Sequence, residues 1–334
     1  MYLHARSVRV VLAVAVACFA GCRARPGPST MPTTQRQDVV LKPYEYRQIH
    51  MGVQARLAVY APDEETAVRA CRAAYKRIAQ LDDVMSDYRP SSELMRLCAK
   101  AGGDPVPVSE DLFRVLERSV ELSARTNGAF DITVGPLVRL WREARKSGKL
   151  PAAEDLAAAK ELCGWQKIKL DREKRTVRLL VFGMKLDLGA IAKGYACDGA
   201  IAVLKAEGIA SAVCEVGGDI VVSGAPPGRP GWIIEVTNDL PGGKSRKIFV
   251  KDRAISTSGD SEQFVVIDGQ RYSHIVDPRT GLGLTHSMLV TIVAKDGLTS
   301  DGLSTAASVL DPERGRELAK LYGAKAYIRP PGGE

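Results

Sequence analysis

The pattern of apolar and polar positions in the first half of the chain predicts two helices after an opening strand. Residues 54–60 alternate with the period of two that is typical of a strand. Behind Asp63, which is suited to cap a helix, apolar side chains recur at helical spacing as far as Leu81. A second helix is expected to begin at Ser109 and to stop at Asn127 and the glycine after it.

The second half of the chain is richer in strands. Segments that are β-branched or alternating, bounded by glycine and proline, predict strands at residues 165–182 (a hairpin), 212–223, 232–237, 264–267 and 288–293. Helices are expected at residues 190–206 and 300–310, followed by one from Pro312 to Tyr322. Because helices and strands do not alternate regularly, we predict a single large α+β domain of mostly antiparallel sheet with packed helices.

The N-terminal segment has the pattern of an export signal. Arg6 and Arg9 precede an apolar run over residues 10–20, which is too short to span a bilayer. Small residues before Cys22 resemble a bacterial lipobox, in which this cysteine would be lipidated after cleavage. The alternative is an ordinary signal peptide cut near Ala20.

These features divide the chain into three expected parts. They are a lipoprotein signal peptide (1–21), a lipidated cysteine with a flexible tether (22–38) and a folded domain (39–330). The tether is rich in Arg, Pro, Ser and Thr, a composition that cannot bury enough apolar surface to fold. We therefore expect an exported protein of the bacterial cell envelope, anchored on the periplasmic face of a membrane through Cys22.

Composition narrows the classes of partner. The formal net charge is +8, and removal of Arg6 and Arg9 with the signal leaves +6. The basic residues are scattered without aromatic interleaving, so no nucleic-acid partner is expected, although a mild positive field suits an anionic ligand. Five cysteines remain after Cys18 and Cys22, none in a C-x-x-C pair, which predicts buried free thiols rather than a metal site.

Three segments carry candidate chemistry. In residues 185–195 an apolar strand is expected to pass through a glycine into a helix, whose free N–H groups and Lys193 could hold a phosphate. The alternative is that Asp187 only caps that helix. Two glycines in residues 215–220 mark either a close ligand approach or a simple kink of the sheet. His274, expected on a short strand before a turn, could act as a base, or it could be structural.

Asp301 and Thr305 form a possible metal-binding pair. They stand at positions i and i+4, so on a helix their oxygens project from one face. One carboxylate and one hydroxyl make a hard-oxygen pair that suits Mg²⁺. The alternative is a capping aspartate beside a buried threonine.

Taken together, the motifs resemble the FAD:protein FMN transferase (ApbE) family from about residue 50 to residue 322. The segments that carry the resemblance are Met51-Gly52, Ser86-Asp87-Tyr88, Ser92-Glu93-Leu94, residues 127–131, residues 187–195, residues 216–220, Ser256 to Gly259, His274 to Gly281, and residues 301–307. Asp87 is a departure, because the family more often has a small polar residue there.

The resemblance implies a set of site residues. The FAD site would be lined by Met51, Tyr88, Ala129, Phe130, Asp131, Asp187 and Lys193, with His274 and Ile275 close to the diphosphate. It further implies that the carbonyl of Ala190, with Asp301 and Thr305, holds Mg²⁺. Tyr88 then becomes a stacking partner for a planar ring. We expect His274 and Asp301 to be the catalytic residues.

The resemblance also implies an activity. This is Mg²⁺-dependent transfer of the FMN half of FAD onto a Ser or Thr hydroxyl of an acceptor protein, with release of AMP. Two alternatives remain open on the sequence alone. One is an FAD pyrophosphatase, in which water replaces the acceptor hydroxyl. The other is a non-catalytic lipoprotein that stores FAD.

Overall fold

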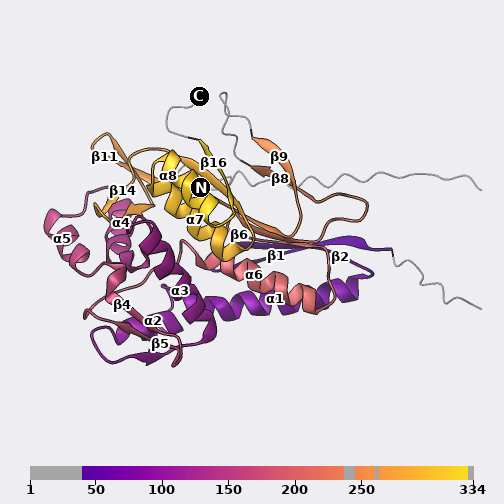
Figure 1. Cartoon of the computed structure of the whole chain (residues 1–334), viewed down its shortest axis with the longest axis horizontal. Coiled ribbons are helices and arrows are strands. Elements are labelled where there is room, and N and C mark those ends of the chain that lie inside the picture. Colours follow the sequence, from indigo (N-terminus) through magenta and orange to yellow (C-terminus); the bar gives the residue numbers. More distant parts are fainter. Residues whose placement is uncertain (1–39, 237–244, 260–262, 330–334) are drawn as a thin grey trace, which may run out of the picture.

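A seven-stranded antiparallel sheet forms the centre of the protein, as seen in the computed structural model, which describes residues 40–236, 245–259 and 263–329 (Figure 1). The strands in spatial order are β1 (Lys42–His50), β2 (Val53–Ala61), β6 (Ala212–Val216), β7 (Asp219–Ser223), β10 (Arg253–Gly259), β15 (Leu289–Ala294) and β16 (Lys325–Arg329). The β1–β2 hairpin turns at Met51 and Gly52, both with positive φ, and β1 forms an edge of the sheet.

Helices cover one face of the sheet. They are α1 (Glu64–Met85), α6 (Ala192–Ala206), α7 (Gly297–Val309) and α8 (Pro312–Leu321), and Figure 1 shows α1, α6 and α7 lying along the strands. Their apolar sides and the inward side chains of the strands form the main core, which includes Leu57, Ile78, Leu204 and Ile292. Burial of this apolar area is the main stabilising contribution to the fold.

A short hairpin covers part of the opposite face. It consists of β8 (Trp232–Val236) and β9 (Arg246–Val250), which pair antiparallel. The buried Trp232 ring packs in a second apolar cluster with Ile220 and Tyr327, and its indole N–H donates to the carbonyl of Ser223. Where this hairpin packs, both faces of the central sheet are therefore covered.

The remaining elements form a lobe at one end of the sheet (Figure 1). They are α2 (Glu93–Ala99), β3 (Val106–Pro107), α3 (Glu110–Arg125), a 3-10 turn (Ile132–Val134), α4 (Gly135–Ser147), α5 (Ala153–Glu161), a second 3-10 turn (Trp165–Lys167), β4 (Ile168–Asp171) and β5 (Thr176–Leu179). Two small hairpins, β11 (Phe264–Ile267) with β12 (Gln270–Ser273) and β13 (Val276–Asp277) with β14 (Leu282–Gly283), complete the fold. Trp141 of α4 packs on the ring of Tyr272 and ties β12 to this lobe.

The predicted α+β class with an antiparallel sheet is confirmed, as are the helix caps at Asp63 and Ser109. Within the described part of the chain, no helix is long and apolar enough to cross a membrane. All five cysteines of this part are free, and all but Cys163 are buried. Cys22 and the expected signal and tether, together with Thr237, lie outside the described residues.

Several boundaries differ from the expectation. Residues 212–223 form two strands, because Gly217 and Gly218 have φ values of 58° and 94° and make a tight turn, so these glycines are neither a kink nor a bulge in one strand. The segment before Asp187 is not a strand, and α7 begins at Gly297, three residues early, because Asp296 caps it. His274 lies between β12 and β13, not on a strand.

Candidate functional site

Two glycines let α6 and α7 cross in backbone contact. A Cβ atom on Gly194 would lie 2.1 Å from the carbonyl oxygen of Gly297 and 2.8 Å from Cβ of Asp301, and a Cβ on Gly297 would lie 2.1 Å from the Gly194 oxygen. No side chain fits at either position without moving a helix. The crossing brings Lys193 of α6 next to Asp301 of α7.

Lys193 joins two buried carboxylates, and we call Lys193, Asp219 and Asp301 the lysine cluster. The Lys193 Nζ lies 3.1 Å from Oδ2 of Asp219 and 3.7 Å from Oδ2 of Asp301, and it donates to the carbonyl of Gly189 at 2.9 Å. Asp219 enters the cluster because it follows the glycine turn between β6 and β7 directly.

The same glycine turn also contacts the β1–β2 hairpin. A Cβ on Gly217 would lie 3.0 Å from Val53 and 3.4 Å from the Lys193 stem. Val53 is two residues beyond Met51, so the turn that carries Met51 adjoins the lysine cluster. Three segments distant in sequence therefore meet at one end of the sheet.

The charges of the lysine cluster favour a cation. Burial opposes the charge of Lys193, but Asp219 and Asp301 outweigh it and raise the pKa of Lys193 above its usual value. Burial, together with the Asp219 carboxylate, raises the pKa of Asp301, while Lys193 acts in the opposite direction. When both carboxylates are ionised, one ammonium leaves a surplus negative charge, which a divalent cation would compensate.

The backbone at the start of α6 leaves one carbonyl oxygen without a partner. The Gly194 N–H donates to Oδ2 of Asp301 at 3.0 Å and not to the carbonyl of Ala190, its helical partner four residues earlier. Within the described residues, the Ala190 carbonyl accepts no hydrogen bond. The Gly194 N–H thus holds Asp301 at the first turn of α6, just after the residue whose carbonyl it leaves unbonded.

Thr305 completes a set of hard-oxygen donors. It lies one helical turn after Asp301 on α7, and its Oγ1 is 3.3 Å from Oγ of Ser258 on β10. Asp301 does not cap α7, because that role belongs to Asp296. No group of three His, Cys, Asp or Glu side chains suited to a metal occurs in the part of the chain that the structure describes. A Mg²⁺ site here would therefore need the backbone carbonyl and hydroxyl oxygens, and the donor set fits that ion.

A second charged group consists of Arg142, Asp87 and Asp187, of which Asp187 precedes Lys193 by six residues, and we call it the arginine bridge. Arg142 of α4 contacts Asp87 through Nη1 at 2.6 Å and Asp187 through Nη2 at 3.0 Å. Its Cζ atom lies 4.5 Å from the centroid of the Tyr88 ring, which is 73% exposed. Asp187 does not cap α6, since its Oδ1 accepts from the N–H of Gly189 and that helix begins at Ala192.

Residues 129–131, also expected at the FAD site, have side chains that are buried or hydrogen-bonded to neighbouring backbone. Ala129 and Phe130 are buried, and Asp131 caps the first 3-10 turn by accepting from the N–H groups of Thr133 and Trp165. Burial raises the pKa of Asp131. Contacts of residues 129–131 with a ligand would therefore involve the backbone.

His274 is held by the residue that precedes β11. Its Nδ1 lies 3.0 Å from the carbonyl of Gln263, and because a carbonyl only accepts, Nδ1 carries the proton in the neutral ring. Nε2 is then the basic nitrogen. Ile275 is buried in the main core and fixes the backbone of this loop.

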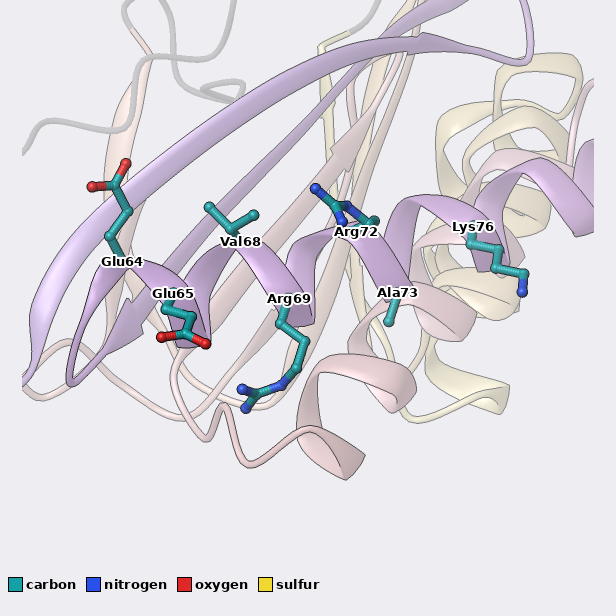
Figure 2. Close-up of a pocket in the computed structure, with 7 residues that line it drawn as sticks. All are labelled: Glu64, Glu65, Val68, Arg69, Arg72, Ala73 and Lys76. Carbon is teal, nitrogen blue, oxygen red and sulfur yellow. The ribbon is translucent and has the colours of Figure 1, made fainter.

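Two surface hollows lie apart from these residues. One, of about 650 Å³, runs along the exposed side of α1 and is lined by the seven residues that Figure 2 labels, among them Arg72 and Lys76. The other, of about 580 Å³, is lined by residues 99–107 and Phe182. Neither includes a member of the lysine cluster or the arginine bridge, so neither marks the candidate site.

The fold and the site define a domain suited to a phosphate-bearing ligand and a hard divalent cation. Residues 51–328 match the ApbE family, and the chain belongs to that family.

Curated relatives agree with this assignment. The chain is 32% identical over 286 residues to an FAD:protein FMN transferase of Klebsiella pneumoniae, covering 83% of this chain and 81% of that protein. It is 28% identical to the FAD:protein FMN transferase of Escherichia coli K12, covering 96% of this chain and 91% of the relative.

Solved structures share the fold. The apo flavinyl transferase ApbE of Pseudomonas stutzeri superposes with a TM-score of 0.75 at 32% identity, covering 87% of this chain and 92% of the other. The flavin transferase ApbE of Vibrio cholerae gives a TM-score of 0.77 at 30% identity, covering 86% and 93%.

Proposed function

We propose that this protein is an FAD:protein FMN transferase, which moves the FMN half of FAD onto a hydroxyl of an acceptor protein. The observation that carries the proposal is the lysine cluster beside the Ala190 carbonyl, which accepts no hydrogen bond within the described part of the chain, in a member of the ApbE family. The relatives named above have this activity in their names. A storage protein would have no use for an ammonium and two acids buried together at this point.

The reaction is a phosphoryl-type displacement. The oxygen of an acceptor Ser or Thr hydroxyl attacks the phosphorus nearest riboflavin, a new O–P bond forms, and the bond from that phosphorus to the oxygen of AMP breaks. Lys193 is placed to offset negative charge on the diphosphate. His274, through Nε2, or a nearby carboxylate takes the proton of the attacking hydroxyl.

Mg²⁺ is part of the proposal. Asp301, Thr305 and the Ala190 carbonyl would hold the ion, since all three offer hard oxygens and the last accepts no hydrogen bond from the residues that the structure describes. When bound, Mg²⁺ supplies Lewis-acid stabilisation of charge on the phosphate oxygens. Asp301 must be ionised to bind it, so metal binding lowers the pKa of this residue from its raised value in the metal-free protein.

The first experiment measures products with the fragment from Arg23 onward. Incubation with FAD, Mg²⁺ and a panel of candidate acceptor proteins should add the mass of FMN to an acceptor and release one AMP for each adduct. A chelator should stop both, and added Mg²⁺ should restore them. AMP with free FMN and no adduct would favour the pyrophosphatase, and tight FAD binding without AMP would leave the storage protein.

We further propose that Cys22 anchors the protein to the periplasmic face of a membrane. The support is the apolar segment that ends in small residues before Cys22. Cys22→Ser should move the full-length protein from the membrane fraction of cells to the soluble periplasmic fraction, with in vitro turnover unchanged. Mass spectrometry should find lipid on the native N-terminal peptide. An unlipidated wild-type peptide would contradict the anchor and favour an ordinary signal peptide.

A further inference from the structure

Arg142 ties together two loops that are far apart in the sequence. Asp87 follows α1 and Asp187 precedes α6, yet the guanidinium contacts both carboxylates through separate nitrogens, at 2.6 and 3.0 Å. The side chains of Asp87 and Asp187 are only 17% and 11% exposed. Two acids this close and this shielded from water would repel each other strongly without a cation between them.

The same guanidinium supports the Tyr88 ring. Its Cζ lies 4.5 Å from the ring centroid, which is the geometry of a cation–π contact. Because Arg142 covers one face and the residue is still 73% exposed, the opposite face of the ring is open to solvent. A planar guanidinium can hold two carboxylates and a ring at once, which a lysine ammonium cannot do as well.

The net charge of the arginine bridge indicates that Arg142 positions other groups and does not bind phosphate. Arg142 contributes one positive charge, and Asp87 and Asp187 contribute two negative ones, so the arginine bridge does not attract a diphosphate. Lys193 lies in the neighbouring cluster and serves that purpose better. The arginine bridge instead fixes the orientation of an exposed aromatic face.

We propose that Arg142 is a positioning residue that holds the open face of Tyr88 in place for a planar ring of FAD. This inference rests on the proposed function, since it takes FAD as the ligand. Lys193 and Asp301 are held independently by Asp219 and by the α6–α7 crossing. Loss of Arg142 should therefore weaken FAD binding and leave the chemical step nearly intact.

The test compares Arg142→Gln with wild type by equilibrium dialysis of FAD and by steady-state kinetics. We expect Kd and KM for FAD to rise about tenfold while kcat changes less than about twofold, the size expected when a cation–π contact and a fixed ring orientation are lost together. Arg142→Lys should give Kd and KM values for FAD between those of wild type and Arg142→Gln. Arg172→Gln is the matched control, because Arg172 bridges Glu117 on the surface and should leave both constants unchanged.

Two further variants make the result specific. Tyr88→Leu should weaken FAD binding by a similar factor, and the double variant with Arg142→Gln should be no weaker than Tyr88→Leu alone, because both changes remove the same interaction. If unpaired acids impair folding of Arg142→Gln, the added change Asp87→Asn removes one of them and should restore the fold without restoring affinity.

The outcomes separate the inference from the proposed function. Unchanged FAD affinity in Arg142→Gln, or losses that add in the double variant, would overturn the role of Arg142. If wild-type protein bound FAD without forming an adduct, the transferase assignment would fail, but the dialysis comparison would still decide whether Arg142 positions Tyr88.

Discussion

Replacement of Asp301 by Asn is expected to lower the rate of FMN transfer by about 10³-fold or more, the scale seen when a group that stabilises transition-state charge is removed. Asn keeps the shape and can still accept the Gly194 N–H bond, so α6 and α7 should stay crossed. It loses the charge that would hold Mg²⁺. The measurement is the rate of AMP release together with the mass of the acceptor, at saturating FAD and Mg²⁺.

Asp296→Asn is the matched control for this prediction. Asp296 lies on the same chain segment and caps α7 by accepting from the N–H of Thr299, a role that Asn fills equally well. That variant should keep wild-type turnover. The metal assignment would be wrong if Asp301→Asn retained wild-type turnover with an unchanged dependence on Mg²⁺.

The sequence predicted correctly those helix starts that depend on a capping residue and on the apolar period directly after it. Asp63 and Ser109 each precede a clear helical period, and their side-chain oxygens accept from the N–H groups of Thr66 and Leu112, so both helices begin where expected. The early start of α7 was missed because three of residues 297–300 are Gly, Thr and Ser, which are buried although they are small, so only Leu298 contributed to an apolar period and Asp296 was overlooked as a cap. The hairpin at Gly217 was missed because its two strands are both apolar.

The candidate site shows the same limit. Asp301 and Thr305 were found because a helical spacing of four is visible in the sequence. Arg142 was missed, because nothing near it in sequence marks a helix-surface arginine as the partner of two distant acids. The one signal available in the sequence was Asp87, which stands where the family more often has a small polar residue. A carboxylate shielded from water needs a cation nearby, so Asp87 could have indicated a basic partner. The role of Gly194 depends on a crossing partner 103 residues later and is visible only in the structure.

Replacement of Gly194 by Ala should destabilise the protein by about 3 kcal/mol or more, at the upper end of the cost of overpacking a core. The new Cβ would lie 2.1 Å from the Gly297 carbonyl oxygen, which is backbone and cannot rotate away. The helices must separate, and Lys193 then moves away from Asp301. We expect a large fall in the denaturant midpoint and, in the folded fraction, loss of turnover.

Gly199→Ala provides the comparison on the same helix. Its Cβ would meet mainly the side chains of Leu81 and Arg77, which can adjust, and Ala gains about 0.8–1.0 kcal/mol of helix propensity over Gly. The gain in helix propensity offsets part of the strain against the buried Leu81 side chain, so this variant should lose less than about 1 kcal/mol, below the usual cost of overpacking. Equal stability of the two alanine variants would contradict the close α6–α7 crossing. Loss of turnover only in Gly194→Ala would tie that crossing to the lysine cluster, because both glycines lie on α6 but only Gly194 meets the backbone of α7.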